Sequence, residues 1–259
     1  MSFERARQVY RTKGLVGFLF VSVRYVYRMS LLALYVDHLR DRLPKRDIYY
    51  TYNGVSVPVE RGWLDAVVPL YVDGKASDNP TYEYAEVGHL KEKLSEGDDV
   101  VIVGGGWGVT AVTAAREVGP EGSVTVYEPN VECYRKCEKV VAANGVADVV
   151  ELNHAVVGEI VSLDWSRGGE ERTGDARVLH PEDLPPADVY ELDCEGAEVP
   201  ILEGIEVRPE WFVIETHGIH GAPKERTVGI LEGVGYEVED VVRGSEGLHV
   251  LTARYTASG

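Results

Sequence analysis

A glycine-rich turn between a buried strand and a helix constrains the fold of this chain more than any other segment. The run VVIVGGGWGVTAV begins at Val100, and its four glycines allow the backbone to approach a ligand closely. The N-terminus of the following helix would direct unpaired N–H groups toward that ligand. Glu128 ends the next strand, about 20 residues later, where doubly wound folds place an acid that binds ribose hydroxyls. The combination predicts a nucleotide-type site.

The spacing of the glycines distinguishes between kinds of cofactor. A dinucleotide fingerprint needs a third small residue, but Val109 occupies that position. A phosphate-binding loop needs Gly-Lys-Ser/Thr, which does not follow this turn. Gly104 and Gly108 have the G-x-x-x-G spacing of S-adenosylmethionine-dependent methyltransferases. A turn that served only the fold would give no reason for the acid at Glu128.

Strand and helix patterns alternate along the chain and predict an α/β fold. We expect helices over 82–94, 199–202 and 227–232, and later strands over 149–157, 188–192 and 211–215, with a polar hairpin or loop over 159–177. Two last strands, 236–242 and 249–253, should pair antiparallel across a short loop. This order favours a doubly wound, mostly parallel, seven-stranded sheet with helices on both faces.

Four segments resemble the FkbM family of S-adenosylmethionine-dependent methyltransferases. They are YEPN from Tyr127, AANG ending at Gly145, ELDCEGAEVPILEGI from Glu191 and WFVIETHG from Trp211. The similarity extends over roughly residues 80–255. It implies a class I, Rossmann-like enzyme that binds S-adenosyl-L-methionine and methylates a hydroxyl of a glycan or small molecule. Ile102 departs from the pattern, because family members carry an acid two positions before the first glycine.

The resemblance and the position of strand ends together give the candidate site residues. The cofactor-binding candidates are Gly104, Gly105, Gly106, Trp107, Gly108, Glu128, Pro129, Asn130, His154, Ala155 and Asp193. The catalytic candidates are Asp193, Glu195 and His217, since a positioned carboxylate or imidazole can take the acceptor proton. Asp193 is favoured because it lies closest to its strand end. No metal site is assigned.

Several of these side chains also have a simpler explanation. Glu195 either orients the acceptor or caps the following helix, and Glu198 is explained as a helix N-terminal acid. His217, with an unperturbed pKa of about 6.5, is either a base or a polar loop residue. His154 is either a neighbour of the adenine ring or a structural histidine. Asn144 is explained as the end cap of a helix.

The chain is acidic, with a net charge of −17 from 43 acidic and 26 basic residues, of which only 8 are lysines. This composition resembles that of haloarchaeal proteins, and an ordinary acidic cytoplasmic protein is the alternative. Either surface repels phosphates, which argues against a nucleic-acid partner. Cys133, Cys137 and Cys194 have neither a zinc-site nor a disulfide pattern, so a reducing cytoplasm is the simplest location.

An N-terminal extension, residues 1–80, precedes a methyltransferase domain expected over 81–259. Residues 15–36 are apolar except for a few side chains that include Arg24 and Arg28, and residues 1–36 hold six basic side chains and one acid. A basic, apolar helix indicates peripheral membrane contact through residues 14–36. Packing on its own domain or on a second subunit of a homo-oligomer is the open alternative. Asn53-Gly54 predicts a hairpin over 48–60, and residues 73–80 read as a linker.

Other functions stay open beside methyl transfer to oxygen. Ile102 motivates a nonenzymatic module that binds an adenosyl ligand or a partner. A nicotinamide oxidoreductase is disfavoured by Val109. Nitrogen acceptors are disfavoured because Asp193-Cys194-Glu195-Gly196 stands where N-methyltransferases often carry Asn/Asp-Pro-Pro-Tyr/Phe.

Overall fold

The computed structural model describes residues 42–62, 77–158, 173–244 and 248–256, together with eight single positions between Arg11 and Leu39. The chain divides into two compact units, residues 1–49 with 59–76 and residues 50–58 with 77–259. In the smaller unit, Lys45 Nζ lies 3.7 Å from Glu60 Oε2. Arg24 and Arg28, on which the expected membrane contact depends, lie outside the described residues, as do residues 73–76. Among the described residues, none forms a helix long and apolar enough to span a bilayer.

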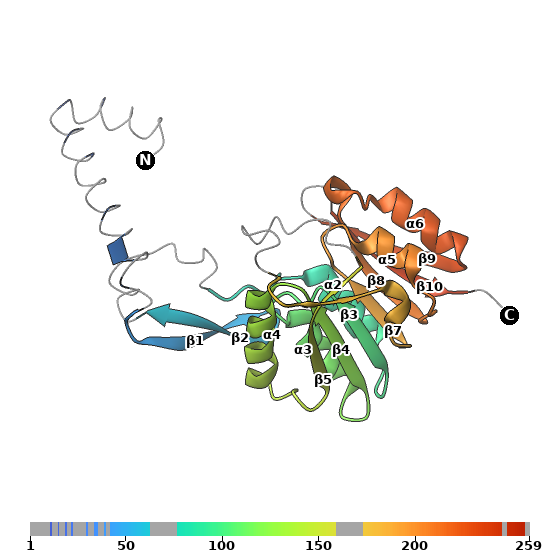
Figure 1. The fold of residues 1–259 in the computed structure, drawn as a ribbon, viewed down its shortest axis with the longest axis horizontal. Coiled ribbons are helices and arrows are strands. Elements are labelled where there is room, and N and C mark those ends of the chain that lie inside the picture. The colour runs from blue at the N-terminus through green and yellow to red at the C-terminus, as the bar shows by residue number, and fades with distance from the viewer. Residues whose placement is uncertain are drawn as a thin grey trace. The chain divides into compact units, whose positions relative to one another are not determined.

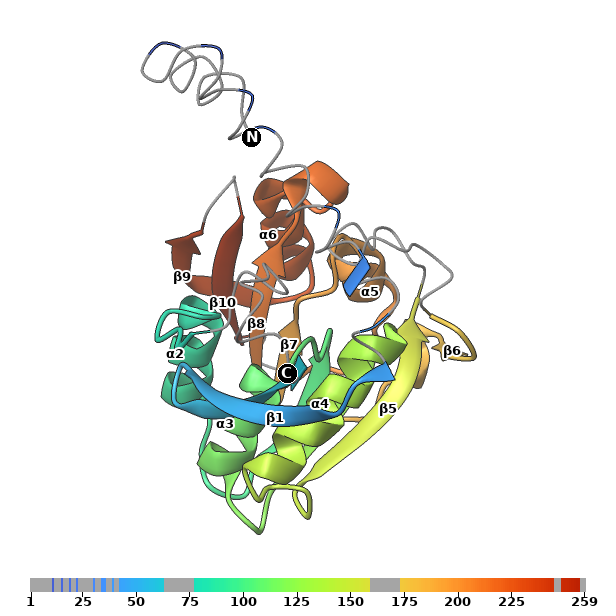
Figure 2. The same ribbon diagram turned by 90° about the vertical axis from the view of Figure 1, so that its left-hand side faces the viewer.

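One sheet of eight strands organises the larger unit, in the order β6–β5–β4–β3–β7–β8–β10–β9 (Figure 1, with β6 labelled in Figure 2). The strands are β3 (Asp99–Val103), β4 (Ser123–Glu128), β5 (Val150–Val157), β6 (Arg177–Leu179), β7 (Val189–Leu192), β8 (Trp211–Thr216), β9 (Tyr236–Arg243) and β10 (His249–Tyr255). Only β10 runs against its neighbours, and it pairs antiparallel with both β8 and β9. The doubly wound, mostly parallel fold expected from the sequence is therefore confirmed.

The strand count of seven was too low by one. The additional strand, β6, pairs with the end of β5 at the sheet edge, with Ala155 opposite Arg177 and Val157 opposite Leu179. It has three residues, so it is too short to show a strand periodicity. It lies at the end of the segment that we expected to be a polar hairpin or loop, of which residues 159–172 lie outside the described part of the chain.

Helices cover both faces of the sheet (Figures 1 and 2). The helices are α2 (Tyr84–Lys93), α3 (Val109–Val118), α4 (Val131–Ala143), α5 (Glu198–Gly204) and α6 (Lys224–Gly233), with short 3-10 helices η5 (Pro181–Asp183) and η6 (Gly218–His220). Side chains alternate between the faces along each strand. Val101 and Val103 belong to the core cluster that includes Ile201 and Leu202 of α5. Ile102 therefore faces the opposite layer, which contains α3.

A hairpin forms around Asn53-Gly54, as the sequence predicted, from β1 (Lys45–Tyr52) and β2 (Val55–Gly62). Both turn residues have positive φ, 46° and 84°, which is the geometry of a type I′ turn. Residues 77–80, the described end of the expected linker, are hydrogen-bonded to the hairpin: Asn53 N donates to Asn79 O at 2.9 Å, and Thr51 N donates to the Asp78 carboxylate at 2.7 Å.

Asn144 attaches the hairpin tip to the rest of the larger unit. It caps the end of α4, as expected, and its side-chain amide also pairs with the backbone of β2. Ser56 N donates to Asn144 Oδ1 at 3.0 Å, and Asn144 Nδ2 donates to Ser56 O at 2.8 Å. Arg116 donates to the same Oδ1 at 2.8 Å and to Gly54 O at 3.0 Å. One amide thus links α3, α4 and the hairpin.

We expect Asn144→Ala to lower the free energy of unfolding by about 1–3 kcal/mol, because it leaves partly buried backbone groups of β2 without partners. Asn153→Ala is the matched control, since the one hydrogen bond that the Asn153 side chain forms with described residues is long, 3.4 Å to Glu151. Urea denaturation measures both. Equal stability of the two variants would show that the amide does not hold the hairpin.

Candidate functional site

The glycine turn is pressed against the backbone that follows β7. Gly104 has φ 102°, and a Cβ built there would lie 1.8 Å from Asp193 O. Gly104 N donates to Tyr127 O at 2.9 Å, and Asp193 N donates to Val103 O at 3.0 Å. These contacts bring the ends of β3, β4 and β7 together at one edge of the sheet, where ligands of doubly wound folds bind.

The other glycines of the turn serve different purposes. A Cβ at Gly105 would lie 2.5 Å from Val126 Cγ1, and one at Gly108 would lie 2.8 Å from Cys137 Sγ. Packing against the sheet and α4 therefore accounts for both. At Gly106 the nearest heavy atom to such a Cβ is Glu83 Oε1, 3.9 Å away. Of the four glycines in the turn, Gly106 is therefore the one with open space beside its backbone.

We expect Gly104→Ala to destabilise the fold far more than Gly97→Ala. Both glycines have positive φ, 102° and 92°, so alanine is strained by about 1–2 kcal/mol at either position. Nothing lies within 4 Å of a Cβ at Gly97, whereas a Cβ at Gly104 meets a backbone carbonyl. The comparison of their unfolding free energies isolates the close approach. Equal losses in the two variants would contradict it.

Glu128 ties the glycine turn to the start of α4. It is 1% exposed, and its carboxylate accepts from Gly106 N and from Asn130 N, each at 2.7 Å. Asn130 in turn caps α4, with its Oδ1 accepting from Glu132 N and Cys133 N. Among the described residues, the buried Asn130 Nδ2 has no hydrogen-bond partner. The Glu-Pro-Asn run thus has a structural role beside the cofactor role predicted for it.

Burial raises the pKa of Glu128 to about 7 from 4.5, although its two backbone N–H donors lower it. Between these values the folded chain holds a proton that the unfolded chain has released. The free energy of unfolding should therefore fall as pH rises from 4.5 to about 7, by at most about 3 kcal/mol for this group. Burial, and then the charge of Glu215, also raise the pKa of Glu86 to about 7, so Glu86 contributes in the same direction.

We predict that Glu128→Gln makes this pH dependence shallower, because the amide does not titrate, while the contribution of Glu86 persists. Chemical denaturation between pH 4.5 and 8 measures it, with the exposed Glu121→Gln as control. A pH profile of Glu128→Gln parallel to that of the wild type would contradict the assignment.

His154 pairs in register with Glu128 on the neighbouring strand. Its Nε2 lies 3.1 Å from Pro129 O, and its ring lies 5.3 Å from that of Tyr134. Ala155, by contrast, is 1% exposed and packs in the core cluster. Trp107 stacks on Tyr52 and Tyr82, at centroid distances of 5.7 and 6.0 Å. These aromatic rings place Trp107 next to the hairpin tip.

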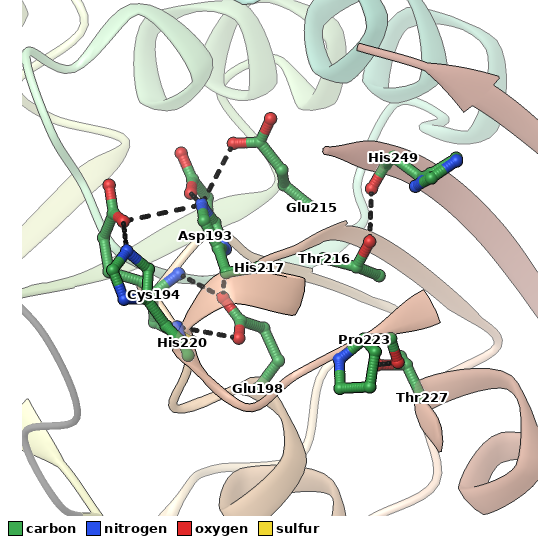
Figure 3. A network of polar contacts seen from close by, with 12 residues as sticks. Asp193, Cys194, Glu198, Glu215, Thr216, His217, His220, Pro223, Thr227 and His249 are labelled. Atoms are coloured by element: carbon green, nitrogen blue, oxygen red, sulfur yellow. Dashed lines mark hydrogen bonds and ion pairs between the residues drawn. The ribbon is translucent and has the colours of Figure 1, made fainter. Parts of the chain in front are cut away.

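Asp193, Glu195 and His217, the catalytic candidates, lie together after β7 and β8. His217 Nε2 lies 3.6 Å from Asp193 Oδ1 and 3.7 Å from Glu195 Oε2. A third carboxylate, Glu215, lies 3.6 Å from the same nitrogen (Figure 3). Burial, and then the charges of Glu215 and Glu191, raise the pKa of Asp193 well above its usual value.

Glu198 orients this histidine and is more than a helix N-terminal acid. It is fully buried, and its carboxylate accepts from Cys194 N at 3.1 Å and from Gly196 N at 2.9 Å. His217 Nδ1 lies 2.7 Å from Glu198 Oε1, so Nδ1 carries the proton and Nε2 faces the other carboxylates (Figure 3). Sequence patterns did not indicate this pair, whose members are 19 residues apart.

The expectation of an unperturbed histidine was wrong. Burial lowers the pKa of His217, but the hydrogen bond and charge of Glu198, followed by the charges of Glu195 and Glu215, outweigh it and raise the pKa above 6.5. The helix-cap explanation of Glu195 was also wrong: the N-cap of α5 is Ala197, with no side-chain cap. Glu195 has φ 53° and lies 3.8 Å from His220 Nε2 as well as near His217.

A buried acid that the sequence analysis did not select lies within β7. Glu191 is 2% exposed, and its Oε2 has no hydrogen-bond partner among the described residues. It pairs in register with Ile102, so both side chains point to the same face of the sheet. Burial, and then the charges of Glu83 and Glu86, raise its pKa well above 4.5. A carboxylate between buried apolar residues of a central strand is itself unusual and was the available signal.

No family model matches the chain, and no curated protein is significantly similar to it. Among solved structures, an S-adenosylmethionine-dependent methyltransferase from Aquifex aeolicus is similar at 19% identity and TM-score 0.46, over 66% of this chain and 89% of that one. An O-methyltransferase from Thermotoga maritima has 15% identity and TM-score 0.47, over 82% and 78%. The O-methyltransferase TomG from Streptomyces achromogenes has 18% identity and TM-score 0.45, over 67% of this chain and 78% of that one. At these values, function must be argued from the site residues.

Proposed function

We propose that this protein is an S-adenosyl-L-methionine-dependent methyltransferase that acts on a hydroxyl of a glycan or small molecule. One observation carries the proposal. The glycine turn and Glu128 lie at the same sheet edge as Asp193, because Gly104 and Asp193 approach each other closely. A cofactor site and an acid–base cluster are thereby adjacent, as a transfer reaction between two bound molecules requires.

The residues present suit this cofactor. Glu128 accepts one backbone N–H at each oxygen, and a carboxylate oxygen can accept more than one hydrogen bond, so both can also accept from ribose hydroxyls. The buried Asn130 Nδ2 lacks a partner among the described residues and is an available donor. His154 and Tyr134 present rings beside Pro129, where an adenine ring would stack.

The acidic surroundings suit a sulfonium donor. Burial, and then repulsion from neighbouring carboxylates that include Glu215, raise the pKa of Glu191 and Asp193, and a bound sulfonium would offset that repulsion and favour the ionised forms. In the transfer, the acceptor oxygen forms a bond to the methyl carbon as the carbon–sulfur bond breaks. The bonding pair stays on sulfur, and S-adenosylhomocysteine leaves. A carboxylate or imidazole of the group Asp193, Glu195 and His217 takes the acceptor proton, a contribution of about 10²–10⁴ in rate.

The alternative, a nonenzymatic module, was motivated by Ile102. Glu191 supplies a carboxylate at the same level of the sheet, one strand away and on the same face. This part of the fold therefore keeps an acidic group although β3 lacks one. That favours an enzyme over a nonenzymatic module. The net charge of −17 continues to argue against nucleic acid as acceptor. Contact of residues 14–36 with a membrane stays a prediction.

Calorimetric titration with S-adenosylhomocysteine and with NAD tests the proposal. We expect S-adenosylhomocysteine to bind and NAD not to bind. Glu128→Ala should weaken S-adenosylhomocysteine binding by about 1.5–3 kcal/mol for each charged hydrogen bond that is lost. Glu121 is exposed, so Glu121→Ala is the control for the same substitution at another glutamate. Thermal unfolding checks that each variant is folded.

Two results would contradict the proposal. Tight binding of NAD with no binding of S-adenosylhomocysteine would point to an oxidoreductase. Unchanged affinity of a folded Glu128→Ala variant for S-adenosylhomocysteine would show that this carboxylate does not bind the ribose.

A further inference from the structure

The second nitrogen of His217 faces a group of carboxylates and forms no hydrogen bond with the described residues. His217 is 3% exposed, and its Nε2 lies 3.6 Å from Asp193 and from Glu215 and 3.7 Å from Glu195. All three distances exceed that of a hydrogen bond. Among the described residues, no hydrogen bond occupies this nitrogen, so it is available to a ligand that reaches the loop.

Glu198 makes the direction of this nitrogen a fixed feature. Its buried carboxylate holds Nδ1 at 2.7 Å, which leaves the lone pair of a neutral imidazole at Nε2, aimed at Asp193 and Glu215 (Figure 3). Histidines that bind metal ions usually donate their other ring N–H to a carboxylate in this way, which sets both the tautomer and the ring orientation.

The spacing of the potential ligand atoms suits a cation. One atom each from Asp193, Glu215 and His217 lies within 4.8 Å of the other two. Two ligands that are each about 2.1 Å from a metal ion stand roughly 3.0–3.4 Å apart in octahedral or tetrahedral geometry. The observed 3.6 Å separations from Nε2 are slightly wider, and the three atoms are within 4.8 Å of one another, so the carboxylates would move inward on binding the ion.

The local charge also calls for a cation. Asp193 and Glu215 lie close together, with Glu195 beside them. Among the described residues, no lysine or arginine forms an ion pair with any of these three carboxylates, and His217 and His220 are their ion-pair partners. A divalent ion would neutralise two of the negative charges at once.

We propose that Asp193, Glu215 and His217 bind a divalent first-row transition-metal ion. One imidazole nitrogen with two carboxylates suits ions such as Mn²⁺ or Zn²⁺ better than it suits the oxygen-preferring Ca²⁺. The role of the ion rests on the proposed function: it would bind the acceptor oxygen and lower its pKa. Asp193 and His217 then serve as ligands, and Glu195 remains as the carboxylate that takes the proton.

The test measures metal binding directly and needs no acceptor. The full chain is freed of metal with a chelator and titrated with Mn²⁺ by calorimetry, followed by Zn²⁺ in competition. We expect one Mn²⁺ per chain. Glu215→Gln and His217→Gln should each weaken binding at least about tenfold, and Glu198→Gln, which changes only the positioning of His217, by about 10–100-fold. Glu182→Gln, on the exposed η5, is the matched control and should bind as the wild type does.

Pulsed electron paramagnetic resonance of the Mn²⁺ complex adds a signature that general charge would not produce. A nitrogen coupling should be present in the wild type and in Glu182→Gln and absent in His217→Gln. Absence of saturable binding of both Mn²⁺ and Zn²⁺ would overturn the site, and so would binding that is unaffected by Glu215→Gln and His217→Gln. Titration of the same samples with S-adenosylhomocysteine separates the two proposals. A chain that binds metal but does not bind S-adenosylhomocysteine would overturn the methyltransferase function and leave the metal site.

Discussion

The close approach of Gly104 to the Asp193 carbonyl is the constraint on which the rest of the site depends. A side chain at residue 104 would occupy the same space as that carbonyl, so the ends of β3 and β7 could not come this close. Because they do, the glycine turn and the acidic loop share one sheet edge. The chemistry proposed here, transfer between a cofactor on one loop and an acceptor on the other, requires this adjacency.

Two buried carboxylates then hold the two loops in place by the same means. Glu128 accepts N–H groups on either side of the proposed cofactor position, from Gly106 and Asn130. Glu198 accepts N–H groups from Cys194 and Gly196 and also holds His217. Each acid replaces water for backbone donors that would otherwise be unsatisfied. The loops are therefore preorganised by the protein itself, which reduces the ordering that ligand binding must supply.

The features that the sequence predicted well depend on local patterns. Asn53-Gly54 encodes its own turn, and the glycine spacing with Glu128 lies within one strand–helix–strand unit. The features that it missed depend on pairing across the fold. Glu191 lies next to Ile102 only through strand register, and the Glu198–His217 pair joins residues from α5 and the end of β8. The raised pKa of His217 follows from those neighbours, so spacing alone could not reveal it.

A crystal structure of the chain with S-adenosylhomocysteine tests the central claim most directly. We predict that the ribose hydroxyls donate to Glu128, that the sulfur lies beside Asp193, and that Gly104 stays in contact with the Asp193 carbonyl. The ligand bound elsewhere, or bound here with its ribose away from Glu128, would contradict the account.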